Sequence, residues 1–165
     1  MLADALAESS GISFKKSSRA HWAQGLVAGV EALILKPQSY MNLSGPVVAE
    51  FMQKLEVPAS DILVAYDDCD LPLGRLRLKK SGGSGGHRGV GSIIETLGTG
   101  EFPRLRIGIG RPEVSGAQTR DYVLTPFEGH EMEDLVEVLE RGVASVDTFL
   151  KEGIERAMNS YNKQL

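Results

Sequence analysis

Three acidic residues follow a short apolar run near the middle of the chain. The run DILVAY (61–66) has the composition of a strand that is buried on both faces, and YDDCD then supplies Asp67, Asp68 and Asp70. Open α/β sheets bind ligands at the carboxyl ends of their strands, so these carboxylates are candidate site residues. A carboxylate at that position can orient a histidine or bind Mg²⁺. The alternative is a solvated turn.

A glycine-rich segment, SGGSGGHRG (81–89), surrounds His87 and Arg88. It lacks the GK[ST] ending of a P-loop and the GxGxxG spacing of a dinucleotide site. Glycines let a backbone pass close to a ligand, and would place His87 or Arg88 in a cleft. The alternative is a mobile surface loop. From the residues alone, Asp67 with His87 is the candidate dyad for activating a water, with contact between the two left open.

A third polar segment, KPQSYMNLSGPV (36–47), places Asn42 between the end of a predicted strand and the start of a predicted helix. Tyr40 and Met41 precede it. An amide side chain both donates and accepts hydrogen bonds, so Asn42 could hold a water and a carbonyl together. The alternative is a helix N-cap, a role that Ser44 could fill equally well.

Basic residues alternate with leucines in RLRLKK (75–80) and return in RLRIGIG (104–110). Alternation of this kind predicts strands with one solvent-exposed face. If Arg77, Lys79 and Arg106 converge, the protein gains a phosphate-binding patch. The alternative is a solvated basic face.

Composition limits the classes of protein to consider. The chain has 165 residues, 42% of them hydrophobic, and a net charge of −4, which predicts one globular domain without a global basic field. Its one cysteine, Cys69, excludes an internal disulfide and suits a reducing cytosol. No apolar stretch is long enough to span a bilayer and no secretory signal is present, so we expect a cytoplasmic protein without membrane partners.

Helical and strand patterns alternate along the chain, which predicts α/β layers. We expect helices over 2–11, 44–57, 90–98 and 132–150, strands within 25–37 and over 61–66, 75–80 and 105–110, a strand or ordered loop over 116–124, and a capping box at 125–128.

In their order and spacing, the segments 36–47, 66–72, 81–89 and 104–112 resemble the bacterial peptidyl-tRNA hydrolases, and the resemblance spans residues 1–165. That family hydrolyses the ester between a peptide and the 3′-terminal ribose of tRNA. The resemblance implies a single α/β domain with a mixed, mainly parallel sheet sandwiched by helices. It also implies a cytoplasmic monomer with peptidyl-tRNA as substrate, no cofactor or metal, and no obligate protein partner.

The resemblance also assigns roles to residues. By position, Asp67 corresponds to the carboxylate that keeps the catalytic histidine basic, and Asn42 to the amide that orients the attacking water or the substrate. Arg88, after His87, stands where the family usually has asparagine, and it keeps hydrogen-bond donors while losing the acceptor. The remaining binding positions are Tyr40 and Met41, which would line the cleft, and Arg77, Lys79 and Arg106, which would clamp the tRNA 5′-phosphate.

One difference from the family concerns the histidine that serves as the catalytic base. Family members begin with a strand, an asparagine–proline–glycine turn and a threonine–arginine–histidine–asparagine string, and these are missing here. We therefore expect the first strand and the histidine base to be absent, and interpret Met1 as a misplaced start, a truncation or a pseudogene product. The expectation is an impaired or inactive 165-residue chain. The alternatives are a non-catalytic RNA-binding protein of the same fold and a metal-dependent phosphohydrolase using the three aspartates.

Overall fold

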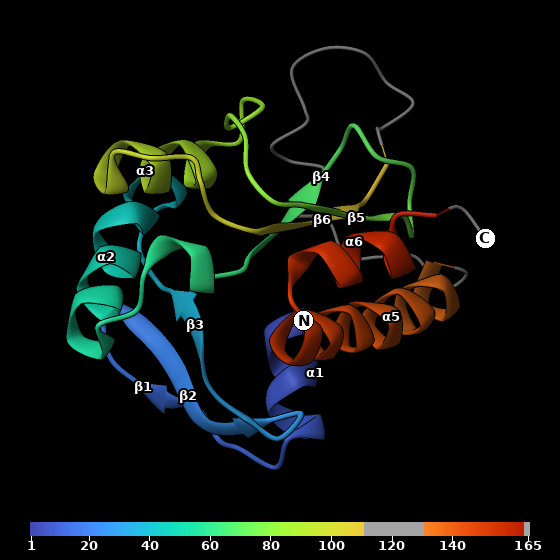
Figure 1. Ribbon diagram of the computed structural model, residues 1–165, viewed down its shortest axis with the longest axis horizontal. Coiled ribbons are helices and arrows are strands. Elements are labelled where there is room, and N and C mark those ends of the chain that lie inside the picture. The colour runs from blue at the N-terminus through green and yellow to red at the C-terminus, as the bar shows by residue number, and fades with distance from the viewer. Residues whose placement is uncertain (111–130, 164–165) are drawn as a thin grey trace. The chain divides into compact units, whose positions relative to one another are not determined.

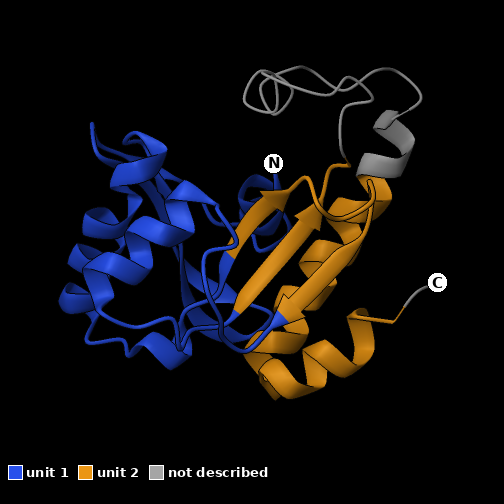
Figure 2. Cartoon of the chain, turned by 90° about the horizontal axis from the view of Figure 1, so that it is seen from above, with its two compact units in different colours: residues 1–64, 79–103 blue, residues 65–78, 104–165 orange. Residues whose placement is uncertain are grey.

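The computed structural model describes residues 1–110 and 131–163, without the side chains of 131–135. Helices and strands alternate along it, which confirms the α/β class (Figure 1). The chain divides into two compact units, Met1–Val64 with Lys79–Pro103 and Ala65–Leu78 with Arg104–Leu165 (Figure 2). No helix within the described residues has the length and apolarity needed to cross a bilayer. The expected strand or loop at 116–124 and the capping box at 125–128 lie outside the described residues.

The first unit combines an antiparallel sheet, in the order β1-β2-β3, with helices. Strands β2 and β3 form a hairpin whose two turn residues, Ala28 and Gly29, have φ angles of 52° and 84°. Positive φ at both positions is the geometry of the tight turn that fits twisted strands. The predicted pair of strands within 25–37 is thereby confirmed, although the first begins earlier. The elements are α1 (Leu2–Ser9), β1 (Lys15–Lys16), β2 (Ala20–Val27), β3 (Val30–Pro37), η1 (Met41–Leu43), α2 (Ser44–Leu55), η2 (Ala59–Asp61) and α3 (Arg88–Leu97).

Helices α2 and α3 approach each other at backbone distance. The Gly45 N–H, in the first turn of α2, donates a hydrogen bond of 3.0 Å to the hydroxyl of Ser92 on α3. A Cβ on Gly45 would lie 2.2 Å from the Ser92 carbonyl oxygen, which is closer than non-bonded atoms can approach. Val47, Val90 and Ile93 are buried in the core of this unit. The contact fixes where α3 begins relative to α2.

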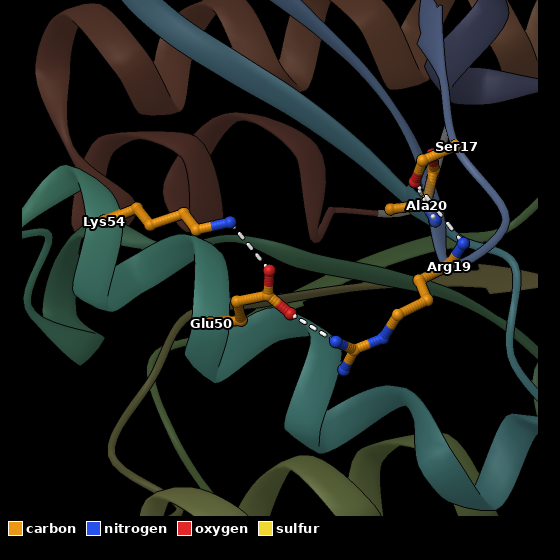
Figure 3. Close-up of polar contacts among 5 residues, drawn as sticks. All are labelled: Ser17, Arg19, Ala20, Glu50 and Lys54. Carbon is orange, nitrogen blue, oxygen red and sulfur yellow. Dashed lines mark hydrogen bonds and ion pairs between the residues drawn. The ribbon is translucent and has the colours of Figure 1, made fainter.

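A small network of ion pairs ties the segment before β2 to α2 (Figure 3). Glu50 accepts from Lys54 at 2.7 Å and from Arg19 at 2.9 Å, and these cations, Lys54 first, lower the pKa of the Glu50 carboxyl. The Ser17 hydroxyl oxygen accepts from the Ala20 N–H and shapes the turn that presents Arg19. Exposed pairs of this kind contribute little stability each. Their effect here is to orient the segment.

The second unit contains a sheet in the order β4-β6-β5, from β4 (Val64–Asp68), β5 (Leu76–Lys79) and β6 (Arg104–Gly108). The Val64 N–H donates to the Pro103 carbonyl at one end of β4 and β6, and the Ile109 N–H donates to Asp68 at the other. The two strands therefore run parallel. Helices α5 (Glu131–Glu152) and α6 (Ile154–Tyr161) lie beside this sheet (Figure 2).

Strand β5 runs antiparallel to β6, because the Gly108 N–H, at the end of β6, donates to the Arg75 carbonyl just before β5 begins. This sheet is mixed, as predicted. The described strands nevertheless form two three-stranded sheets, and the expected single, mainly parallel sheet is not seen in them. The physical reason in the first unit is local: a two-residue turn can join only antiparallel neighbours.

One strand is displaced from its expected position, and one helix was not expected. The predicted strand 61–66 is shifted to Val64–Asp68, because the chain after Pro58 forms η2, in which the Asp61 N–H bonds the Pro58 carbonyl. Asp67 and Asp68 thus lie within the strand. The long C-terminal helix is confirmed, but α6 was not predicted. Gly153, with φ of 83°, ends α5 and serves as the N-cap of α6.

We predict that Gly45→Ala destabilises the protein. The added methyl group collides with the backbone of α3 at Ser92, and overpacking of this kind costs about 1–3 kcal/mol. Gly91→Ala is the matched control, since its Cβ would meet nothing nearer than the Ser84 side chain at 3.7 Å. Urea unfolding measures both variants, and equal midpoints would contradict the close packing.

Candidate functional site

Tyr40, Met41 and Asn42 lie together at the surface, where η1 follows β3. The side chains of Tyr40 and Met41 are 80% and 53% exposed, and Asn42 is exposed as well. Leu43 is the N-cap residue of α2, so the N-cap interpretation of Asn42 is wrong. Ser44 is not the cap either, since its hydroxyl donates to the Met41 carbonyl at 2.9 Å and closes the turn. The Asn42 amide bonds no described side chain or backbone group, which leaves it available to a ligand.

The glycine-rich segment meets this turn at the start of α3. A Cβ on Gly89 would lie 2.6 Å from the Met41 sulfur and 3.1 Å from His87 Cε1, so the two side chains flank the bare glycine backbone. Arg88, the first residue of α3, is exposed. Two of the four segments predicted to be functional are thereby brought together: Tyr40–Met41–Asn42 and His87–Arg88. We call this group the η1–α3 surface.

His87 has a defined structural role as the N-cap of α3. Its Nδ1 accepts a hydrogen bond of 3.2 Å from the Val90 N–H. An accepting Nδ1 carries no proton, so in the neutral ring the proton resides on Nε2. A general base needs an unprotonated nitrogen facing its water. His87 could offer Nε2 as a base only by moving its proton to Nδ1 and losing the cap, which argues against the Asp67–His87 dyad.

The two neighbouring aspartates of β4 have different environments. Asp68 Oδ2 forms an ion pair of 2.5 Å with Arg106 Nε, and both side chains are mostly buried, at 12% and 16% exposed. Its Oδ1 accepts from the Asp70 N–H at 2.9 Å. The hydrogen bond with Asp68 is the largest effect on Arg106 and raises the pKa of its guanidinium. Asp68 is therefore a structural carboxylate, a role that the sequence analysis did not assign.

Asp67 is half-buried, and it makes no hydrogen bond or ion pair with any described residue. Successive strand residues face opposite sides of a sheet, so Asp67 lies on the other face of β4 from Asp68. Within the described ranges, no three Asp, Glu, His or Cys side chains come close enough to hold a metal ion. The solvated-turn interpretation is wrong for Asp67 and Asp68, because both belong to β4 and neither is fully exposed.

The predicted basic strand is confirmed by its burial pattern. Leu76 and Leu78 are buried, whereas Arg77 is exposed and Lys79 partly so. The bond from Gly108 to Arg75 sets the register of β5 on β6 and places Arg77 opposite Arg106. Arg77 and Arg106 thus share a face of the sheet, but Arg106 is already paired with Asp68. The more available cations of this basic face are Arg77 and Lys79.

Comparisons with known proteins all identify the same family. The sequence model of the family described as Peptidyl-tRNA hydrolase matches residues 1–165. The chain belongs to the peptidyl-tRNA hydrolase family. It is 46% identical to the peptidyl-tRNA hydrolase of Carboxydothermus hydrogenoformans over 164 residues, 99% of this chain and 87% of that protein. It is 47% identical to that of Symbiobacterium thermophilum over 165 residues, 98% of this chain and 87% of the relative.

Solved structures show the same relationship. The crystal structure of peptidyl-tRNA hydrolase from Acinetobacter baumannii superimposes with a TM-score of 0.89 at 31% identity, covering 98% of this chain and 82% of that one. The chain is therefore a member of a peptidyl-tRNA hydrolase enzyme family. The roles that the resemblance gives to Asp67, Asn42 and the basic face become proposals about a hydrolase of this kind.

We predict that His87 contributes to stability as a helix cap. His87→Ala removes the acceptor for the Val90 N–H and should lower the free energy of unfolding by about 1 kcal/mol. His87→Asn retains an oxygen that can accept the same bond and should stay near the wild-type stability. Chemical unfolding of the three proteins measures this, and an equal loss in both variants would show that the cap is not the stabilising contact.

Proposed function

We propose that this protein hydrolyses the ester bond between peptide and tRNA in peptidyl-tRNA and so recycles tRNA during translation. The observation that carries the proposal is the match to the peptidyl-tRNA hydrolase family over residues 1–165, with relatives of 46% and 47% identity. The availability of Asp67 supports it. Its carboxylate is half-buried and pairs with no described residue, so it is available to polarise a base.

The η1–α3 surface is the proposed binding site for the reacting end of the substrate. Tyr40 offers an exposed ring for stacking on a base, and Met41 an adaptable apolar contact. Asn42 can orient the attacking water or the ester carbonyl, because its amide has both donors and an acceptor. Arg88 replaces the family's usual asparagine with a donor-only side chain, which suits a phosphate or carboxylate oxygen.

Asp67 is proposed to hold a histidine base in its basic tautomer, since a free carboxylate is too weak a base near neutral pH. No histidine of residues 1–165 is assigned as that base: His21 lies on β2, His87 caps α3, and His130 lies outside the described residues. The expectation of an impaired or inactive 165-residue chain stays a prediction that competes with this proposal, and the peptide-release experiments distinguish the two. The single-domain organisation, the monomeric state and the cytoplasmic location also stay predictions.

The basic face is proposed to bind a phosphate of the tRNA, through Arg77 and Lys79 above all. Phosphate contacts supply affinity and position without reading sequence. Arg106 contributes the ends of its guanidinium, while its Nε is held by Asp68. The rival function, RNA binding without catalysis, would use the same two surfaces and leave Asp67 without a role.

We predict that Asp67→Asn slows peptide release from peptidyl-tRNA about 10²–10⁴-fold, the range expected when general-base catalysis is disabled. Binding of tRNA should be unchanged, because Asp67 lies on the other face of β4 from Asp68 and Arg106. Asp61→Asn is the control, an exposed carboxylate of η2. Release of labelled peptide under single-turnover conditions measures the step. Equal rates for wild type and Asp67→Asn would remove Asp67 from the mechanism.

We predict that Arg77→Ala and Lys79→Ala each weaken tRNA binding and reduce the slope of log K against log salt by roughly one charge. Arg106→Ala should instead lower stability, because it leaves the mostly buried Asp68 without its cation. Filter binding at several salt concentrations and urea unfolding separate the two effects. An unchanged salt slope in both β5 variants would exclude the basic face as the tRNA contact.

A further inference from the structure

A second group of cations surrounds a cavity in the unit that contains β4, β5 and β6. The cavity has a volume of about 230 Å³ and is bordered by the turn before β5, by α5 and by Lys163, the second residue after α6. Its polar lining consists of Arg75, Arg141 and Lys163, and its apolar wall of Pro72, Leu73 and Leu76. No acidic residue lines it among those that the structure describes.

Arg75, Arg141 and Lys163 are not paired with any carboxylate of the described residues. Within the described part of the chain, none of them forms an ion pair or a side-chain hydrogen bond, whereas Arg19, Lys36, Lys54, Arg106 and Arg156 are each paired with a carboxylate. Glu137 lies one turn before Arg141 on α5 and is exposed, but the two do not pair. Three like charges around one small cavity repel one another, and an anion bound there would relieve that repulsion.

The walls of the cavity are held by contacts independent of the cations. The Arg75 N–H donates to the Pro72 carbonyl at 3.1 Å, and Gly74, with φ of 82°, donates to Gly108, so the turn is fixed on β6. A Cβ on Gly74 would lie 3.3 Å from Val138 of α5, which shows how closely the turn packs on that helix.

The side of the cavity formed by Lys163 is held in place by the neighbouring Asn162. Its side-chain amide bonds the Leu78 backbone in both directions, accepting from the N–H at 2.7 Å and donating to the carbonyl at 3.0 Å. It thereby pairs with the free edge of β5 as a neighbouring strand would, and Lys163 follows it directly. Arg75, Arg141 and Lys163 are therefore brought to the cavity by a rigid frame.

We propose that this cavity is a binding site for a phosphate group, held by Arg75, Arg141 and Lys163. Arginine guanidinium groups match the oxygens of phosphate in pairs, and a lysine adds a point charge. The volume is below the range of about 300–1,000 Å³ typical of sites for drug-sized molecules, so the bound group is small. Leu73 and Leu76 give one apolar side on which the phosphate's substituent can rest.

The site is separate from the basic face proposed for tRNA. Leu76 lines the cavity, and Arg77, the next residue of β5, points to the opposite side of the sheet. The phosphate belongs to one of two sources: a free anion such as pyrophosphate, or the backbone of an RNA that reaches this side of the unit. Both present the same chemistry to the three cations.

The test titrates inorganic pyrophosphate into the protein at low ionic strength and measures binding by calorimetry. Arg141→Gln and Lys163→Gln should each weaken binding about tenfold or more, the loss expected for one charge-assisted contact. Arg141→Lys keeps the charge but loses the paired hydrogen bonds, so its affinity should lie between those of wild type and Arg141→Gln. Lys151→Gln, which removes an exposed cation of α5 that pairs with no described residue and does not line the cavity, is the matched control and should change nothing. Thermal melts of the free proteins verify folding.

The same variants in tRNA binding distinguish the sources. Weakened tRNA binding with a reduced salt slope in Arg141→Gln assigns the site to RNA backbone phosphate, and unchanged tRNA binding assigns it to a free anion. Pyrophosphate binding that is absent, or that falls no further in Arg141→Gln and Lys163→Gln than in Lys151→Gln, would overturn the proposal. The pyrophosphate measurement does not depend on hydrolase activity.

Discussion

The η1–α3 surface depends on two glycines that let the starts of two helices touch. Gly45 sits against the α3 backbone at Ser92, so a methyl group there would push α2 and α3 apart, and Gly89 sits against the side chains of Met41 and His87. Interiors are packed densely enough that such a shift cannot be absorbed locally. Tyr40, Asn42 and Arg88 are displayed together because their backbones are held at this distance. Hydrogen bonds from Ser44 to Met41 and from Val90 to His87 then fix the two chain directions.

A second constraint gives the adjacent carboxylates Asp67 and Asp68 different environments. Strand geometry turns Asp67 and Asp68 to opposite faces of β4. Asp68 neutralises Arg106 and receives the Asp70 N–H, so it holds the strand ends together. Asp67 is left half-buried and without a described partner. Asp68 thus stabilises the strand ends, whereas the Asp67 carboxylate is available to a ligand or a base.

Much of this architecture is predictable from local pattern. The alternation of leucines with cationic residues predicted β5, and the spacing of apolar residues before Gly98 predicted α3. Each pattern lies within a single element. Tyr40 and Met41 were assigned to the cleft only through the family resemblance, whereas Asn42 and His87 were singled out from their residue types and positions. The pairing of Asp68 with Arg106 joins residues 38 apart, and depends on which strands are neighbours. No local pattern reports that, and the same holds for Arg75, Arg141 and Lys163 around their cavity. His87 as a helix cap was missed because histidine is not a common residue in that role.

The claim at the centre of this account is that the protein cleaves the ester of peptidyl-tRNA, and does not merely bind the RNA. The most direct test is a single-turnover experiment with the protein in excess over labelled peptidyl-tRNA, in which bound tRNA and released peptide are followed in the same sample. We predict release of free peptide faster than the uncatalysed reaction, at a rate that saturates with protein concentration, leaving intact tRNA. Saturable binding with peptide release no faster than in buffer would contradict it, and would identify the protein as an RNA-binding member of the family.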